Sequence, residues 1–326
     1  MKAIKFFAIS AMAAAMITSC SSEDELSQSN YPSDNIIRVT AGVNNAKTRA
    51  EGAGTEMKND FSLTIVNKNA PKYTYTDKVF SKSSGDWACS ETLLWQKSDA
   101  LVDIVAFAPA QTGKFNGVYA EGSIQPIAYS VASDQSTSSA NNDLLYYYAK
   151  DFKPGDKLVD KKLSIQFNHA FCMIDIVVTL GTEFNKPNVL KESPIVKVTL
   201  GGTKIAANVD VTNAASVVTA SEEAAATDIT TTNGTFTTAA NAEANAKSYF
   251  SCIAIPQTVA ANTFKVSLMT AGKRYEWTSA DKVELKSGYR YTLNLSMGND
   301  VVLLKGGSIS ATPWTEITSD KPLETD

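Results

Sequence analysis

The chain has 326 residues, and its 30 Lys and Arg against 34 Asp and Glu give a formal net charge of −4 at pH 7. This mild acidity, with no basic block, excludes the clustered Lys and Arg that a nucleic-acid-binding surface needs. Val, Ile, Thr, Tyr and Phe are abundant while long stretches of helical spacing are absent, which predicts an all-β protein. The length predicts two domains, each able to bury its own core.

The N-terminus has the pattern of a signal peptide over residues 1–19. Lys2 and Lys5 are cationic, and the apolar run Phe6–Met16 is too short to span a bilayer. Cys20 follows directly and resembles the lipobox cysteine of bacterial lipoproteins, whose thiol is acylated. The alternative is an ordinary signal peptide cleaved before a cysteine. Acyl chains, at about 0.8 kcal/mol per buried CH₂, would anchor the chain without any spanning segment.

Residues 20–34 are expected to form an acidic and polar tether. The run Ser21-Ser22-Glu23-Asp24-Glu25 resembles the export signal that places lipoproteins of Bacteroidetes on the outer face of the outer membrane. Low hydrophobicity alone would also explain a solvated tether. We therefore expect a surface-exposed lipoprotein of the outer membrane, with the simple tether as the alternative.

An N-terminal domain is expected over residues 35–157. Within 36–43, Ile37, Val39, Ala41 and Val43 alternate with polar residues, which predicts a strand. The small and polar residues 44–54 predict a loop that contains Arg49. Further strand patterns cover 61–66, 72–76, 101–109 and 143–149, separated by turn residues as in β-sandwiches.

A C-terminal domain is expected over residues 158–326. The apolar parity of 163–178 switches near His169, which predicts a bulge or a bend there. Strands are also predicted at 195–200, 209–211 and 289–297. For the Ala- and Thr-rich stretch 203–247, solvated hairpins and irregular loop are both open, and Asn233-Gly234 predicts a tight hairpin turn.

The sequence contains little that indicates catalysis. His169 is the only histidine, so a His-based metal site is excluded, and its apolar surroundings argue against a Ser-His-Asp arrangement. Asp103, Asp175, Glu276 and Glu284 are expected to be outward-facing strand residues. We expect no enzyme activity, no metal and no cofactor.

Three cysteines remain once Cys20 is acylated. They are Cys89, Cys172 and Cys252. Because three cysteines cannot all pair with one another, at least one thiol is free. Cys172 and Cys252 lie in apolar runs and are expected to be buried and unpaired, with a bridge between them as the alternative.

Several short motifs in series resemble one family, the fimbrillin-like proteins of Bacteroidetes, which are the subunits of type V pili. The motifs are the lipobox at Cys20, Thr48-Arg49-Ala50, 103–109 (DIVAFAP), 143–145 (DLL), 167–170 (FNHA), 255–257 (IPQ), 286–291 (KSGYRY) and 309–314 (ISATPW). The resemblance implies two transthyretin-like β-sandwich domains, export as an acylated precursor, and a polymer with other pilus subunits that mediates adhesion.

The resemblance also implies assembly by strand exchange. A protease would cut between Arg49 and Ala50 and release the first strand, and the last strand of a neighbouring subunit would fill the open groove. The displaced strand would carry Ile37, Val39, Ala41 and Val43. The donor strand would carry Val301, Val302, Leu303, Leu304, Ile309 and Trp314.

Two alternatives stay open. Residues 36–43 and 301–314 are also compatible with the first and last strands of a self-contained lipoprotein, and the polar tail 315–326 departs from an optimised donor strand. Stalk, tip and anchor positions in a pilus are not distinguished. A monomeric surface lipoprotein could instead bind a protein or a glycan through its loops, with Trp87, Trp95, Tyr146–Tyr148 and Trp277 as stacking candidates.

Overall fold

The computed structural model describes residues 30–44, 55–57, 59–110, 119–120, 123–138, 142–186, 188–304 and 309–314. Strands dominate these ranges, which confirms the predicted all-β class at the level of secondary structure. Helical structure is limited there to short turns. They include α1 (Pro154–Lys157), η1 (Pro71–Tyr73) and η3 (Thr182–Asn185). Within the same ranges, no helix is long and apolar enough to cross a membrane.

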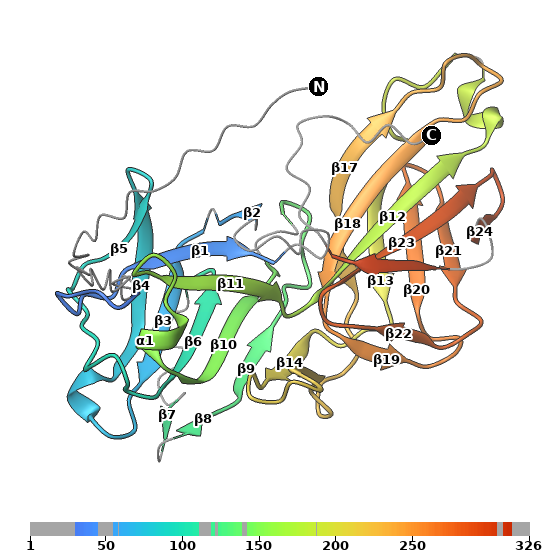
Figure 1. Ribbon diagram of the computed structural model, residues 1–326. Coiled ribbons are helices and arrows are strands. Elements are labelled where there is room, and N and C mark those ends of the chain that lie inside the picture. Colours follow the sequence, from blue (N-terminus) through green and yellow to red (C-terminus); the bar gives the residue numbers. More distant parts are fainter. Residues whose placement is uncertain are drawn as a thin grey trace, which may run out of the picture.

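Eight strands form one sheet in the order β11-β10-β6-β3-β4-β5-β1-β2, drawn in blue to green in Figure 1. They are β1 (Val39–Val43), β2 (Thr55–Glu56), β3 (Phe61–Val66), β4 (Tyr75–Ser83), β5 (Asp86–Cys89), β6 (Val102–Ala108), β10 (Leu145–Phe152) and β11 (Leu163–His169). Because β11 also pairs with β1, the sheet closes on itself. A short separate hairpin is formed by β7 (Tyr119–Ala120) and β8 (Ser123–Ile124).

The closed sheet surrounds a hydrophobic core of its own. Phe61 lies at its centre, with ring contacts to Phe80, Trp87 and Phe167 at centroid distances of 5.3, 4.9 and 5.5 Å. Alternation along β11 directs Leu163, Ile165 and Phe167 into the same core. Such alternation is expected for a strand with one buried face.

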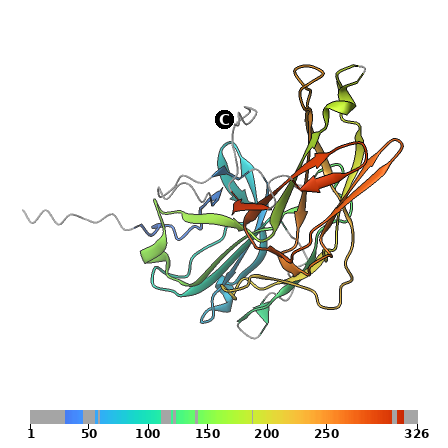
Figure 2. The same cartoon turned by 90° about the vertical axis from the view of Figure 1, so that its right-hand side faces the viewer.

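The second half of the chain is built from smaller sheets, drawn in yellow-green to red in Figure 1. The largest has the order β17-β18-β12-β23-β24, with β25 also on β23. Its strands are β12 (Cys172–Leu180), β17 (Thr232–Thr237), β18 (Lys247–Ala254), β23 (Tyr289–Met297), β24 (Val302–Leu304) and β25 (Ser310–Pro313). In the view turned by 90°, the blue-to-green strands and the yellow-green-to-red strands again lie on opposite sides (Figure 2).

Three further sheets complete this half. One contains β16 (Ile229–Thr230), β13 (Ile195–Gly201), β20 (Lys265–Thr270) and β21 (Arg274–Thr278). Another joins β15 (Val218–Ala220) and β14 (Ala206–Val209) to β9 (Ile127–Ser130), and the last pairs β19 (Gln257–Val259) with β22 (Val283–Leu285). The β14–β15 hairpin thus resolves part of the stretch 203–247, and it pairs with a strand from the first half of the chain.

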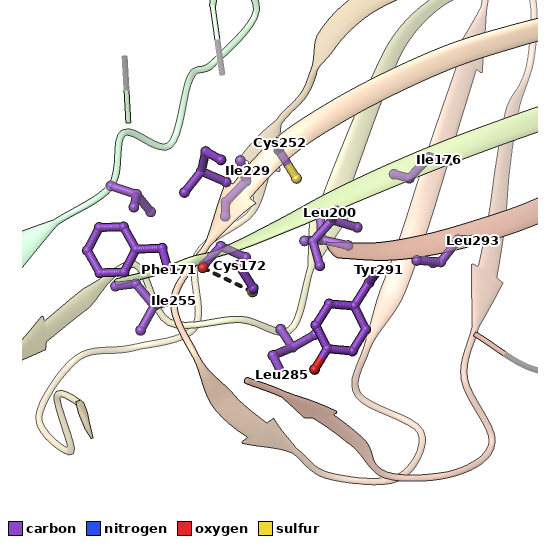
Figure 3. Close-up of a cluster of buried hydrophobic side chains, with 14 of the residues drawn as sticks. Phe171, Cys172, Ile176, Leu200, Ile229, Cys252, Ile255, Leu285, Tyr291 and Leu293 are labelled. Carbon is purple, nitrogen blue, oxygen red and sulfur yellow. Dashed lines mark hydrogen bonds between the residues drawn. The ribbon is translucent and has the colours of Figure 1, made fainter. Parts of the chain in front are cut away.

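A second hydrophobic core lies among these sheets (Figure 3). Cys172 and Cys252 are fully buried in it as free thiols, so the alternative of a bridge between them is wrong. Burial raises the pKa of both thiols, and the Cys172 Sγ donates a hydrogen bond to the carbonyl of Ala254 at 3.2 Å. Both cysteines are therefore small apolar core residues with little thiolate character.

The parity switch near His169 marks the passage between the two cores. The buried residues of β11 have odd numbers up to His169, and those of β12 have even numbers from Cys172 onward. Ala170 and Phe171 lie between the two strands and are fully buried. The predicted bend is confirmed, and β11, which follows the expected boundary at 157/158, pairs with the strands that precede it.

Three local predictions are wrong. The strand expected at 72–76 begins only at Tyr75, because Pro71–Tyr73 form the turn η1. Asn233 and Gly234 do not form a hairpin turn but lie within β17, where the register against β18 is irregular. A Cβ on Gly234 would lie 2.9 Å from the carbonyl oxygen of Tyr249, so close backbone approach explains the glycine. Asp103 is buried rather than exposed: it lies on the same face of β6 as Val105 and Phe107, is 5% exposed, and has Lys68 Nζ at 2.9 Å.

The two terminal strands as the candidate functional site

The first predicted strand fills a gap between two parts of the N-terminal sheet. β1 runs parallel to β11 with five paired positions, from Val39 opposite Leu163 to Val43 opposite Phe167. On its other side β1 pairs with Trp87 of β5 at Val39 and with β2 at Gly42 and Val43. The strand is therefore neighboured on both sides, and its removal would leave two facing edges.

The residues that lead into β1 are also fixed by backbone hydrogen bonds. The amide of Ile37 donates to the carbonyl of Leu93 at 2.9 Å, and the amide of Trp95 donates to the carbonyl of Asn35 at 2.8 Å. Asp34 forms an exposed ion pair with Arg38, which lowers the pKa of the carboxyl to about 2. Hydrogen bonding thus continues over the whole segment from residue 34 to residue 44.

The core-facing residues of this segment are those expected from the sequence. Ile37, Val39 and Val43 are at most 5% exposed, and Ala41 is half-buried against the same core. Each fully buried side chain of this size contributes about 1.5–3 kcal/mol. The three buried residues together therefore contribute about 5–9 kcal/mol, so β1 is a substantial part of the core it covers.

The C-terminal segment, residues 301–304 and 309–314, lies along the outer edge of β23. β24 pairs with Leu295–Met297, and β25 pairs with Tyr289–Thr292. Of the described side chains, Val302 and Trp314 are buried and Ile309 is half-buried. All four residues of β25 are exposed.

β24 carries apolar residues on both of its faces. Val302 is 6% exposed, whereas its neighbours Val301 and Leu303 are 50% and 59% exposed. Edge strands of soluble proteins usually place polar residues on the outer face, and a continuous apolar run is typical of a strand that is covered on both faces. The structure therefore leaves Val301 and Leu303 exposed, although the apolar run is suited to burial on both faces.

Trp314, the last described residue, packs on a buried pair of polar side chains, His169 and Asp143. Its ring stacks on that of His169 with a centroid distance of 3.8 Å and an interplanar angle of 12°. His169 Nδ1 lies 2.6 Å from an oxygen of Asp143. The sequence placed Asp143 and His169 in separate motifs, and no local spacing rule could have joined them.

The His169–Asp143 pair does not form a catalytic triad. His169 Nε2 is buried, and among the described residues it has no hydrogen-bond partner and hence no serine nucleophile. Ser287 Oγ instead donates to the carbonyl of Ala170 at 2.6 Å. Within the described part of the chain, no group of three or more His, Cys, Asp or Glu side chains could hold a metal ion.

An open groove of about 1130 Å³ adjoins Trp314 and His169. Lys204 and Gln257 also line it. The Lys204 Nζ donates to the carbonyl of Ser221 at 2.9 Å, and the Gln257 side-chain amide donates to the carbonyl of Lys204 at 3.0 Å. The polar groups of these two side chains are therefore engaged within the protein itself.

The aromatic residues considered for glycan stacking are built into the cores. Trp95 is 2% exposed, Trp87 packs on Phe61, and Trp277 meets Phe264 edge to face at a centroid distance of 6.4 Å. Tyr146–Tyr148 are half-buried on β10. Of these rings, Tyr146 lines the groove that adjoins Trp314. Cys20, Arg49 and Ala50 lie outside the described residues, so the predicted lipidation and cleavage sites stay predictions.

The fold and the two terminal strands define the class of protein: a β-rich chain with two cores, whose first strand closes one sheet and whose last strands lie at the edge of another. A family model described as fimbrillin-like matches residues 48–314. The chain belongs to the fimbrillin-like family. The matched region begins one residue before Arg49 and ends at Trp314.

Solved structures support the same fold. A fold match to a candidate cell adhesion protein from Bacteroides ovatus has a TM-score of 0.60 at 18% identity and covers 87% of this chain and 99% of that one. A candidate cell adhesion protein from Bacteroides uniformis gives a TM-score of 0.57 at 14% identity, covering 87% and 100%. A fimbrial protein from Bacteroides vulgatus gives 0.52 at 15%, covering 86% and 99%. No curated protein matches the chain.

Proposed function

We propose that this chain is a lipid-anchored subunit of a surface fimbrium and that it joins its neighbours by strand exchange. β1 is the strand that leaves, and the C-terminal segment of another copy takes its place. The similar Bacteroides proteins are named as cell adhesion or fimbrial proteins. These names support adhesion as the role of the polymer. Acylation of Cys20 and the acidic tether 20–34 place the precursor at the outer membrane surface.

The observation that carries this proposal is the apolar surface of β24. Val301 and Leu303 are half or more exposed in the monomer, although they continue the same apolar run as the buried Val302. A groove left by β1 between β11 and β5 would offer backbone partners on both sides and a core face below. A strand with apolar residues on both faces suits such a groove better than it suits an open edge.

Cleavage alone would not empty the groove. Ile37, Val39 and Val43 contribute about 5–9 kcal/mol of burial, and the backbone of β1 is paired on both sides. A cut β1 therefore stays bound until another strand offers comparable burial. This requirement ties release of the first strand to arrival of a neighbour and prevents empty grooves from aggregating.

The distribution of arginine supports a single cleavage site. The chain has four arginines, and three of them lie on or beside paired strands: Arg38 before β1, Arg274 in β21 and Arg290 in β23. Arg290 is also paired with Asp175. Proteases cut extended, accessible backbone, so Arg49 between β1 and β2 is the arginine we expect an Arg-specific protease to use.

We also propose a division into two domains that differs slightly from the expected boundary at 157/158. β11 belongs to the closed N-terminal sheet through its pairing with β1 and β10. The division then falls at Ala170 and Phe171, where the chain passes from β11 to β12. Val105 and Phe107 of the N-terminal sheet pack against the second core, so the two domains share an apolar contact.

The proposal is tested with a purified chain that starts at Ser21. Treatment with an Arg-specific protease should give a ladder of bands on an unheated gel, and Arg49→Ala should leave only monomer. Arg38→Ala is the matched control and should give the same ladder as the unmodified chain. Complete cleavage after Arg49 without any ladder would contradict strand exchange.

A further inference from the structure

The end of the described chain is attached to the point where the chain passes between the two cores. The Trp314 ring stacks on His169 at a centroid distance of 3.8 Å, and its amide donates to the carbonyl of Gly288 at 2.8 Å. Gly288 in turn donates to the carbonyl of Phe171 at 2.9 Å and has a φ of +70°, a conformation that favours glycine. Trp314 therefore contacts the His169–Phe171 junction directly and through the turn that precedes β23.

The indole ring of Trp314 covers the buried His169–Asp143 pair, which is only partly satisfied by hydrogen bonds. The side chains of His169 and Asp143 are 3% and 10% exposed, and their hydrogen bond of 2.6 Å fixes the imidazole. Among the described residues, the other polar atoms of the pair, His169 Nε2 and Asp143 Oδ1, have no hydrogen-bond partner. Covering this pair with a large aromatic ring keeps it out of water while the ring stays in place.

Trp314 is also the largest buried side chain of the C-terminal segment. The four residues of β25 are exposed, Ile309 is half-buried, and Val302 is buried at the other end. A strand that moves from one sheet edge to another replaces one set of backbone hydrogen bonds with a similar set. How strongly the segment is held on its own subunit then depends mainly on its side chains. Trp314 loses the largest buried apolar surface when the segment leaves.

We propose that Trp314 is an intramolecular clasp that holds the C-terminal segment on β23 of its own subunit until strand exchange. The stack on His169 must open before the segment can leave. The clasp therefore controls how often the segment is available to a neighbour. This proposal rests on the proposed function, because it assigns a role to the segment that we expect to be donated.

The clasp is tested first on uncut monomer by hydrogen exchange measured with mass spectrometry. Trp314→Ala should speed exchange in peptides covering 301–314 about tenfold or more, since loss of a buried aromatic ring weakens local packing. Trp314→Phe, which keeps a ring to stack, should stay close to the unmodified protein. Thr312→Ala, an exposed position on the same strand, is the matched control, and unchanged exchange in β12 shows that the fold is intact.

The second measurement uses one donor and one acceptor, so that only a single joint can form. The donor is Arg49→Ala, which cannot be cut, and the acceptor is cleaved protein that carries Leu303→Asp. Adding Trp314→Ala to the donor should speed formation of the dimer about tenfold or more. An equal or slower rate for the Trp314→Ala donor, or unchanged exchange of 301–314 in Trp314→Ala, would overturn the clasp. If neither donor forms a dimer, strand exchange fails, and the hydrogen-exchange result decides the clasp by itself.

Discussion

Leu303→Asp is expected to leave the monomer folded and to abolish the ladder. The side chain is 59% exposed on the outer face of β24, so the substitution should change the free energy of unfolding by no more than about 0.5 kcal/mol. In the proposed joint the same side chain is covered by the acceptor subunit. An unpaired carboxylate there costs several kcal/mol, which lowers the association constant by about a hundredfold or more.

Val196→Asp is the matched control for this prediction. Val196 lies on β13 and is 57% exposed, so the two variants change exposed hydrophobicity and charge in the same way at different places. Thermal unfolding of both monomers should be close to that of the unmodified chain, and only Leu303→Asp should lose the ladder. A normal ladder from Leu303→Asp would remove β24 from the joint.

Cys20→Ala is expected to move the protein from the membrane fraction to the soluble fraction of cells. Two or three acyl chains, at about 0.8 kcal/mol per buried CH₂, hold a protein firmly on a bilayer. Loss of the thiol removes the attachment point for those chains. The measurement is immunodetection in membrane and soluble fractions, with Ser21→Ala as the control. Unchanged membrane association of Cys20→Ala would exclude lipidation at this residue as the anchor.

Much of the local structure could be predicted because alternation in a strand reports directly which face is buried. The pattern of Ile37, Val39 and Val43 predicted β1 and its core face, and the parity switch near His169 predicted a bulge or a bend where the chain turns into β12. Such patterns depend on neighbours one or two residues away. They hold in the folded protein because the side-chain period of a strand is fixed by backbone geometry.

The partners of these strands could not be predicted in the same way. The parallel pairing of β1 with β11 joins residues 124 positions apart, as in the 2.8 Å hydrogen bond between the Asn44 and Asn168 side chains. Asn233-Gly234 has the residues of a tight turn, yet the approach of the Tyr249 backbone requires glycine in a strand. Asp103 was expected to be exposed, but it is buried, where it pairs with Lys68 and accepts a hydrogen bond from the Asp151 amide. In each case a distant residue decides the outcome.

The candidate site shows the same division. The sequence singled out Val301–Leu304, Ile309 and Trp314 as one apolar series, but it did not indicate that Trp314 stacks on His169 or that Asp143 supports the imidazole. The available signal for this pair was that His169 is the only histidine in the chain and that Asp143 opens a separate motif. The geometry of the stack needed the fold.

The claim that β1 is replaced by a neighbour's C-terminal segment is tested most directly by cross-linking in mixed-isotope polymers. Light and heavy copies carry a photoreactive phenylalanine analogue at position 301, next to β24, and are cut, assembled and irradiated together. We expect cross-links from position 301 of one copy to β11 or to Leu93–Trp95 of a copy with the other isotope label. Cross-links confined to β21 and β23 of the same copy would contradict it.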